Sequence, residues 1–209
     1  MLKQTTVCFS IADESMPRAA RVPRSDNRLQ LILDAAARLF REKGYAATSM
    51  RDIAGAVDML PGSLYYHFES KGALLVAVYA EGVRRFSETV AGAIAGPREP
   101  WGRLEAGCVA HLEALLQASD YAQVVIRVHP SDAPDVAAAL VRLRDGYEAL
   151  FRGLVDALPL ARGVDRRALR LMLIGALNWS QTWYHRGKDT PQRIARDFVA
   201  LLRAPVEGI

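Results

Sequence analysis

The sequence predicts an all-α protein of about nine helices, in which a small N-terminal three-helix domain precedes a larger helical domain. Strand patterns are nearly absent, and apolar residues instead recur at the three-to-four-residue spacing of helices. Proline and glycine residues separate these helical stretches. With 209 residues, 51% of them hydrophobic and 24% charged, the chain is long enough and apolar enough to bury a packed core.

The first helix is expected to run from residue 26 to residue 43. Ser25 or Asp26 can cap its start, and Gly44 can end it. Its apolar residues form one stripe, which consists of Leu29, Ile32, Leu33, Ala36 and Phe40. The preceding residues, 1–25, are predicted to form a flexible N-terminal arm, with Met16 as an alternative start of the natural chain.

Two short helices joined by a tight turn are expected next. The first spans residues 49–57 and is capped by Thr48 or Ser49. Asp58 follows in the turn, where we expect the left-handed conformation that such turns usually give to glycine. The second helix begins at Pro61, because proline is favoured at the first helical position.

The second of these helices is too short and too polar on its outer side to be a core element. Leu64 and Phe68 share its inner face. The outer side keeps Ser63, Tyr65 and His67, and we expect Tyr66 beside them to be partly packed. A helix pair of this kind is typical of the helix-turn-helix that reads double-stranded DNA.

The remaining helices follow from apolar periodicity, with proline and glycine near their ends. The one β-like run, at residues 124–128, lies between helical patterns, and we interpret it as a short buried helix. The expected ranges are 71–94, 101–118, 121–128, 132–158, 165–185 and 191–202.

Charge and residue pattern exclude several classes of function. The net charge is +4, but residues 26–71 hold six Lys or Arg and six Asp or Glu, a difference of zero, which disfavours a nonspecific DNA-packaging protein. No spacing of carboxylates, Ser/His/Asp or Cys/His groups points to an enzyme. His111 and His129 stand alone and the two cysteines are far apart, so we expect neither a metal site nor a cofactor. Without a membrane-length apolar run or a signal peptide, a cytoplasmic protein is expected.

A specific resemblance covers about residues 28–75. The chain carries there Gly44-Tyr45, Thr48-Ser49, Ile53-Ala54 and the run Gly62-Ser63-Leu64-Tyr65-Tyr66-His67-Phe68. This pattern resembles the DNA-binding domain of TetR-family transcriptional regulators. The resemblance implies an all-helical homodimer, with residues 26–71 as the DNA-binding domain and residues 72–209 as the effector-binding and dimerisation domain.

The same resemblance implies which residues contact the operator. They are Thr48, Ser49, Arg51, Gly62, Ser63, Tyr65, His67 and Lys71. Helix N-termini such as that near Ser49 attract phosphate, Arg51 can instead reach a guanine edge, and Lys71 would clamp the DNA backbone. Two residues depart from the family's pattern, because Leu60 replaces a serine cap and Asp58 replaces the turn glycine.

The C-terminal part resembles one branch of the family through Gly175-Ala176-Leu177-Asn178-Trp179, Trp183-Tyr184 and Thr190-Pro191. Several members of that branch repress fatty-acid, phenylacetate or sterol-ring catabolism and respond to acyl-CoA thioesters. The resemblance implies a small hydrophobic effector, with an acyl-CoA as one candidate. A regulator of an efflux pump that senses lipophilic drugs is the alternative.

Aromatic residues at helical spacing and one amide within an apolar helix are the candidate effector contacts, although core or dimer packing is the alternative for each aromatic side chain. The candidates are Tyr147, Phe151, Asn178, Trp179, Trp183 and Arg186. Arg127, Arg144 and Lys188 are further candidates for the phosphates of an acyl-CoA.

The last two helices are expected to form the homodimer interface, as the resemblance implies. One apolar seam holds Leu169, Met172, Leu173 and Ala176, and the other holds Ile194, Phe198 and Leu201. A dimer is needed to hold two reading helices one turn of DNA apart on a palindromic operator. We therefore expect a ligand-responsive regulator that acts as a repressor, although activation remains an alternative.

Overall fold

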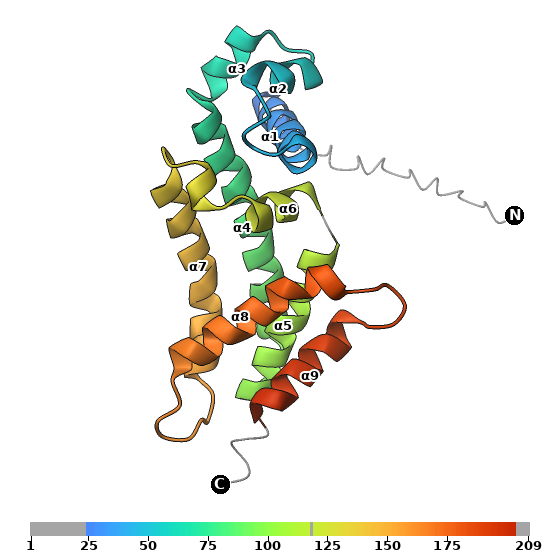
Figure 1. The fold of residues 1–209 in the computed structure, drawn as a ribbon, viewed down its shortest axis with the longest axis vertical. Coiled ribbons are helices and arrows are strands. Elements are labelled where there is room, and N and C mark those ends of the chain that lie inside the picture. Colours follow the sequence, from blue (N-terminus) through green and yellow to red (C-terminus); the bar gives the residue numbers. More distant parts are fainter. Residues whose placement is uncertain (1–23, 118, 204–209) are drawn as a thin grey trace, which may run out of the picture.

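The computed structural model describes residues 24–117 and 119–203, and these residues are helical, as the sequence predicts (Figure 1). They form nine α-helices and one short 3-10 helix, η1. The elements are α1 (Arg24–Lys43), α2 (Met50–Ala56), α3 (Pro61–His67), α4 (Lys71–Ile94), α5 (Pro100–Leu116), α6 (Asp120–Arg127), η1 (Pro130–Asp132), α7 (Ala137–Asp156), α8 (Arg166–Trp183) and α9 (Pro191–Arg203). The predicted arm and Met16 lie outside the described residues, except that residues 24 and 25 already belong to α1.

The three helices α1, α2 and α3 form a head at one end of the molecule (Figure 1). Ile32, Ala36 and Phe40 of α1 are buried in the apolar cluster that also contains Ile53 of α2 and Leu64 of α3. The same cluster continues along α4 into the rest of the chain. The head is therefore packed on the body and shares its core with it.

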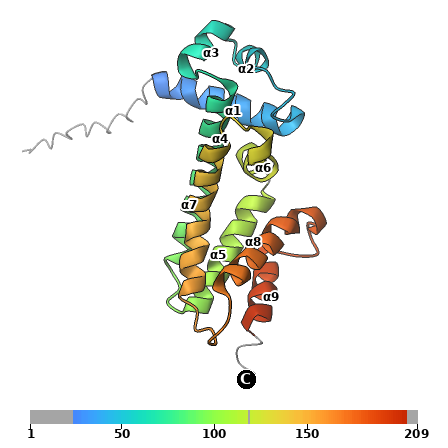
Figure 2. The same ribbon diagram turned by 60° about the vertical axis from the view of Figure 1, so that its left-hand side comes forward.

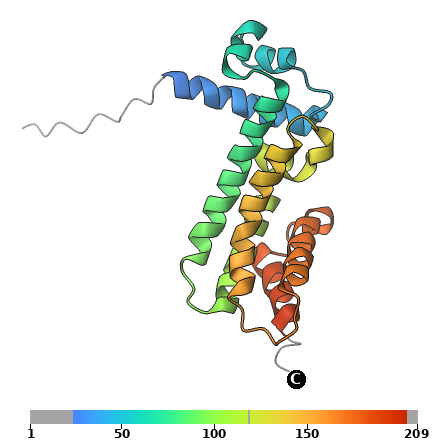
Figure 3. The same ribbon diagram turned by 90° about the vertical axis from the view of Figure 1, so that its left-hand side faces the viewer.

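The body is a bundle built around α4, whose 24 residues make a helix about 36 Å long. α4 and α7 run side by side away from the head (Figure 3). α5 packs against both of them, and α8 and α9 cover the other side of α5 (Figure 2). One end of α4 therefore lies in the head and its other end lies in the body.

The short helix α6 joins the body to the head. A Cβ atom on Gly82 of α4 would lie 2.6 Å from Val125 Cγ2 and 3.1 Å from the Tyr121 carbonyl oxygen, so only glycine lets α6 approach this closely. On its other side, the Tyr121 hydroxyl donates to Asp34 of α1 at 2.8 Å. Arg41 of α1 also pairs with Asp120 at 3.0 Å. A displacement of α6 would therefore be transmitted to α1.

One predicted element differs from the structure. The helix expected over residues 132–158 is divided into η1 and a shorter α7 that begins at Ala137. Pro134 explains the division, because a proline disfavours the helical conformation of the residue before it, and Ala133 has φ −140° and ψ 71°. No helix among the described residues is long and apolar enough to cross a membrane.

Candidate DNA-binding surface and effector cavity

The helix-turn-helix has the turn that the sequence predicts. Asp58 has φ 53°, the left-handed conformation expected of it, and the Met59 amide donates back to the Ala54 carbonyl oxygen at 2.9 Å. Leu60 is the N-cap of α3 and forms no side-chain cap hydrogen bond. Proline at the first helical position and the buried Leu64 side chain instead fix the start and the inner face of α3.

The outer face of α3 leaves two tyrosines uncovered. Tyr65 is 53% exposed and Tyr66 is 89% exposed, while Gly62 and Ser63 beside them are also exposed. The expectation that Tyr66 is partly packed is wrong, because nothing in the head covers its ring. The less exposed residue is His67, whose ring meets that of Tyr66 edge-on, with centroids 5.7 Å apart.

The N-terminus of α2 is capped by the side chains of Ser49 and Asp52. Ser49 Oγ accepts from the Asp52 amide at 3.1 Å, and Asp52 Oδ2 accepts from the Ser49 amide at 2.8 Å. The hydrogen bonds from Ser49 hold the pKa of the Asp52 carboxyl at about 2. Arg51 is exposed beside this cap and is free to reach outward. Thr48 is 1% exposed and its hydroxyl donates to the Gly44 carbonyl oxygen at 2.8 Å, so the expected DNA contact of its side chain is corrected to a structural role.

Lys71 is held by contacts within the protein. Its Nζ donates to the carbonyl oxygens of Tyr45, Ala46 and Thr48 at 2.9, 3.3 and 2.9 Å. It also lies 4.4 Å from the centroid of the Tyr45 ring. An ammonium group has three donors, and all three are used within the protein. Lys71 therefore joins α4 to the loop between α1 and α2, and its contact with the DNA backbone stays a prediction.

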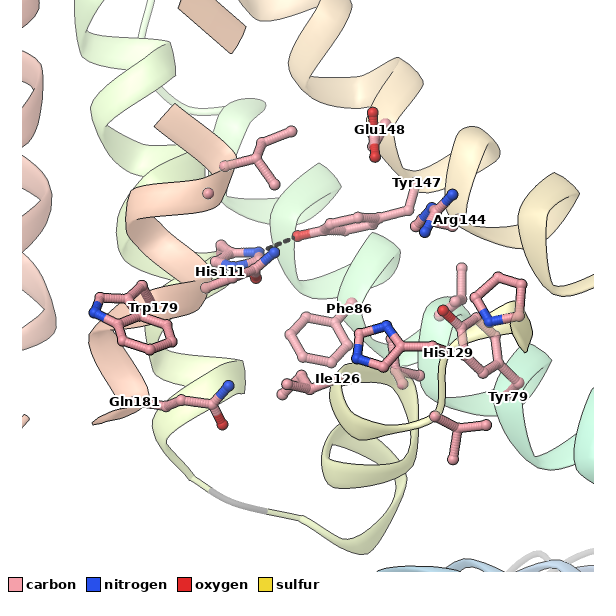
Figure 4. Close-up of a pocket in the computed structure, with 17 residues that line it drawn as sticks. Tyr79, Phe86, His111, Ile126, His129, Arg144, Tyr147, Glu148, Trp179 and Gln181 are labelled. Carbon is pink, nitrogen blue, oxygen red and sulfur yellow. Dashed lines mark hydrogen bonds between the residues drawn. The ribbon is translucent and has the colours of Figure 1, made fainter. Parts of the chain in front are cut away.

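A cavity of about 410 Å³ lies between α4, α5, α6, α7 and α8 (Figure 4). Its apolar walls come mainly from Val83, Phe86, Val125, Ile126, Val128 and Ile174. Tyr79 and Asn178 add polar groups inside it, and Arg144, Glu148 and His129 add ionisable ones. A volume of roughly 300 to 1,000 Å³ with apolar walls and few polar groups is usual for a small-molecule site.

Three side chains from three helices form a hydrogen-bonded network at the cavity wall. Tyr147 Oη of α7 lies 2.6 Å from His111 Nδ1 of α5, and His111 Nε2 lies 3.0 Å from Asn178 Oδ1 of α8. Burial lowers the pKa of His111 to about 4, so the imidazole is neutral. With the proton on Nε2, His111 donates to Asn178 and accepts from Tyr147. The Asn178 amide nitrogen keeps its two donors for the cavity.

Tyr79 is a second unused donor. Tyr79 is 3% exposed and lines the cavity. No buried side-chain nitrogen or oxygen atom among the described residues lacks a partner, so the Tyr79 hydroxyl, which bonds to none of them, is open to the cavity. Burial raises the pKa of the Tyr79 hydroxyl, while the nearby Arg144 guanidinium opposes that rise. A ligand oxygen in the cavity could accept a hydrogen bond from this hydroxyl, at a net gain of about 0.5–1.5 kcal/mol.

The structure brings together half of the predicted effector residues. Tyr147, Asn178 and Trp179 line the cavity. Phe151 is fully buried behind His111, with ring centroids 5.8 Å apart, and so supports the wall from outside. Trp183 packs on Phe198 near the end of α8 and Arg186 lies in the exposed loop beyond it, so neither residue lines the cavity.

Sequence reasoning missed most of the cavity lining, including the polar residues His111 and Tyr79. His111 was one of two isolated histidines, but it falls on the apolar face of α5 with Leu104, Cys108 and Leu115. A polar side chain on a buried helical face needs a partner, which was the available signal. No group of three or more His, Cys, Asp or Glu side chains in the described part of the chain could hold a metal ion.

The predicted dimer seam is only partly exposed. Leu173 and Ile194 are buried within the chain, so they cannot meet a partner, and this part of the prediction is corrected. Met172 and Leu201 are 60% and 71% exposed, whereas Leu169, Ala176 and Phe198 are partly buried. The large apolar side chains that α8 leaves exposed are Leu171, Met172, Trp179 and Trp183.

Comparison with known proteins gives two family matches. The model for bacterial regulatory proteins of the tetR family matches residues 32–78, and the model for the tetracyclin repressor-like C-terminal domain matches residues 97–206. Together these matches include the helix-turn-helix and all helices from α5 to α9.

Two curated relatives are transcriptional regulators. The HTH-type transcriptional repressor KstR2 of Rhodococcus jostii strain RHA1 is 46% identical over 59 residues, which is 28% of this chain and 29% of KstR2. The chain thus spans less than a third of that relative. The HTH-type transcriptional activator FasR of Mycolicibacterium smegmatis is 27% identical over 176 residues, 83% of this chain and 78% of FasR.

A solved structure with a similar fold is that of AibR in complex with isovaleryl coenzyme A and operator DNA. It superimposes with a TM-score of 0.71 at 26% identity, covering 83% of this chain and 97% of AibR.

Proposed function

Because the chain belongs to the TetR family of bacterial regulatory proteins, we propose that it is a homodimeric repressor that a small hydrophobic effector releases from a palindromic operator. A coenzyme A thioester is the effector class that we propose. The observation that carries the proposal is the position of the cavity. Its walls include α4 and α6, and these two helices also pack on the DNA-binding head.

The DNA contacts come from the outer face of α3 and the start of α2. Ser63, Tyr65 and Tyr66 are exposed on α3, and Gly62 lets a phosphate backbone approach closely. Arg51 is the exposed cation of α2 and reaches a phosphate or a guanine edge. Ser49 and His67 lie at the border of this surface and have smaller roles.

The dimer forms through α8 and α9. Leu171, Met172 and Trp179 of α8 and Leu201 of α9 are large apolar side chains that nothing in the single chain covers. Such a patch is expected at an interface between copies of the chain. The pairing would place the two heads at the spacing of successive major grooves, roughly 34–36 Å apart.

The effector presents at least one oxygen acceptor to the cavity. The hydrogen-bond donors in its wall include the Tyr79 hydroxyl and the Asn178 amide nitrogen, and much of the remaining wall is apolar. A thioester carbonyl attached to an apolar acyl group has this chemistry. The similarity to AibR, which was solved with isovaleryl coenzyme A, supports the same class.

Release follows from a difference in effector affinity between two conformations. An effector in the cavity contacts Tyr79 of α4 and Val125 of α6, and α6 is hydrogen-bonded to α1 through Tyr121. Any displacement of these helices therefore moves the head and changes the distance between the two heads of the dimer. Couplings of this kind are typically about 1–3 kcal/mol, or roughly 5- to 150-fold in operator affinity.

A panel of ligands tests the proposal. The full-length protein is first used to select an operator from random DNA. Its melting temperature and operator affinity are then measured with isovaleryl, octanoyl and phenylacetyl coenzyme A, with the free acids, and with lipophilic drugs. We expect a thioester to raise the melting temperature and to weaken operator binding. A response to drugs alone would favour the efflux-pump regulator.

The variant Tyr79→Phe tests whether the Tyr79 hydroxyl binds the effector. This hydroxyl is open to the cavity, so the melting temperature of the free protein should change little, while the thioester affinity falls about tenfold. If this variant bound every effective thioester as tightly as the wild type does, Tyr79 would not be part of the effector site.

A further inference from the structure

A second hollow, of about 390 Å³, lies between α7 and α8. Four of the six residues that line it are arginines, namely Arg152, Arg166, Arg167 and Arg170, and the remaining two are Val155 and Asp156. It is separate from the effector cavity, with which it shares no lining residue.

The hollow continues the effector cavity along the same two helices. On α7, Glu148 lines the cavity and Arg152 lines the hollow, one helical turn or about 6 Å farther along. On α8, Ile174 and Arg170 have the same relation. Residues four apart lie on one helical face, so the cavity and the hollow follow one another along the facing sides of α7 and α8.

An ion pair marks the boundary between them. Arg170 Nη1 lies 3.0 Å from Glu148 Oε2, and Arg170 is only 8% exposed. Because Glu148 neutralises this arginine, Arg170 contributes a fixed wall and little net charge. The ion pair therefore separates the two compartments, and a ligand that spans both must pass beside it.

The other three arginines leave the hollow positively charged. The Arg166 guanidinium donates to the carbonyl oxygens of Val155 and Leu158, which fixes it at the C-terminal end of α7 without neutralising it. The guanidinium groups of Arg152 and Arg167 are exposed and have no partner among the described residues. Asp156 is the one acid in the lining. The hollow therefore contains three arginines without a carboxylate partner and a single acid, Asp156.

We propose that this hollow binds the phosphate groups of the effector while the acyl group occupies the cavity. The proposal rests on the proposed function, in which the effector is a coenzyme A thioester. A cavity of about 410 Å³ suits a ligand of ordinary drug size, and a coenzyme A thioester is larger because a nucleotide with three phosphates extends beyond its acyl and pantetheine portions. Arginine binds phosphate oxygens in bidentate geometry, so Arg152 and Arg167 are suited to hold them.

The test compares two forms of the same acyl group. The first is a coenzyme A thioester that binds the wild-type protein, starting with the isovaleryl compound, and the second is its N-acetylcysteamine thioester, which lacks the phosphates. Affinities are measured by calorimetry for the full-length wild type, for the double variant Arg152→Ala/Arg167→Ala, and for the control Arg98→Ala/Arg142→Ala. The control removes two exposed arginines outside the hollow.

The wild type and the control should bind the coenzyme A thioester at least about tenfold more tightly than the N-acetylcysteamine thioester, with an affinity that falls as salt rises. The hollow variant should lose most of this preference and its salt dependence, while its affinity for the N-acetylcysteamine thioester stays unchanged.

Three results would overturn the assignment. The hollow variant could keep the wild-type preference, it could lose affinity for both thioesters equally, or it could become monomeric, which would assign the arginines to the dimer interface. A wild-type protein that binds N-acetylcysteamine thioesters as tightly as coenzyme A thioesters would also reject the phosphate site and leave the proposed function standing. A wild-type protein that binds no thioester would instead refute the proposed effector class, and the phosphate site with it.

Discussion

Replacement of Lys71 by methionine separates the structural role of this residue from a role in DNA binding. Methionine keeps most of the length of the side chain and removes the ammonium group. The three carbonyl oxygens of Tyr45, Ala46 and Thr48 then lose the donor that the structure shows at 2.9–3.3 Å. The contact with the Tyr45 ring, at 4.4 Å from the centroid, loses its cation.

The expected cost follows from these contacts. A hydrogen bond to a charged group is worth about 1.5–3 kcal/mol, but three bonds to one group are not additive, and water can replace part of them at this half-buried position. With a cation–π contribution of about 0.5–1 kcal/mol, we expect Lys71→Met to lower the free energy of unfolding by about 2–4 kcal/mol. For a chain of this size, the melting temperature should fall by roughly 5–15 °C.

The assay is thermal unfolding followed by circular dichroism, with operator affinity measured well below the transition. Lys43→Met is the control, because it removes an exposed lysine that pairs with Asp52 at 3.2 Å and should cost less than about 1 kcal/mol. A Lys71→Met protein that melts like the wild type but does not bind the operator would refute the structural role. That result would assign Lys71 to a contact with the DNA backbone.

Three further outcomes are expected. Tyr65→Ala and Tyr66→Ala should each weaken operator binding at least about tenfold in fluorescence anisotropy at unchanged melting temperature, since both rings are exposed, and unaltered affinity in both would remove them from the interface. The pKa of His111 is about 4 in the folded chain, below its usual 6.5. Between pH 4 and pH 6.5 the unfolded chain therefore binds more protons than the folded chain. The free energy of unfolding should therefore fall by up to about 3 kcal/mol as pH drops from 6.5 towards 4, and His111→Gln should remove this part of the dependence in denaturant titrations. Met172→Glu should give a monomer in sedimentation experiments and abolish operator binding, whereas a stable Met172→Glu dimer would place the interface elsewhere.

The helix-turn-helix could be predicted in detail because its determinants are local. Pro61 fixes the start of α3, and Leu64 identifies its buried face through the spacing of apolar residues. Asp58 was recognised as the left-handed residue of the turn because few other side chains tolerate that conformation.

The contacts of Thr48 and Lys71 could not be predicted because they depend on the positions of backbone carbonyl oxygens. The Lys71 ammonium group bonds to carbonyl oxygens 23 to 26 residues away, and no side-chain pattern records the position of a carbonyl oxygen. Thr48 has the same difficulty, since its hydroxyl reaches back to the end of α1.

The effector cavity shows a similar limit. Asn178 was predicted because an amide in an apolar helix is unfavourable without a partner, and the structure supplies that partner in His111. Phe151 was misplaced because helical spacing shows that an aromatic residue is buried but not whether it faces a cavity or lies behind its wall. That distinction depends on where α4, α5, α7 and α8 diverge, which is a property of tertiary packing.

The central claim is that occupancy of the cavity and binding of the operator are linked. Calorimetry of an effective thioester with the free dimer and with the operator-bound dimer tests this claim most directly. The thioester should bind the operator-bound dimer more weakly, by the same factor, about 5- to 150-fold, by which a saturating thioester weakens operator binding. Equal thioester affinity for the free and the operator-bound protein would contradict the account.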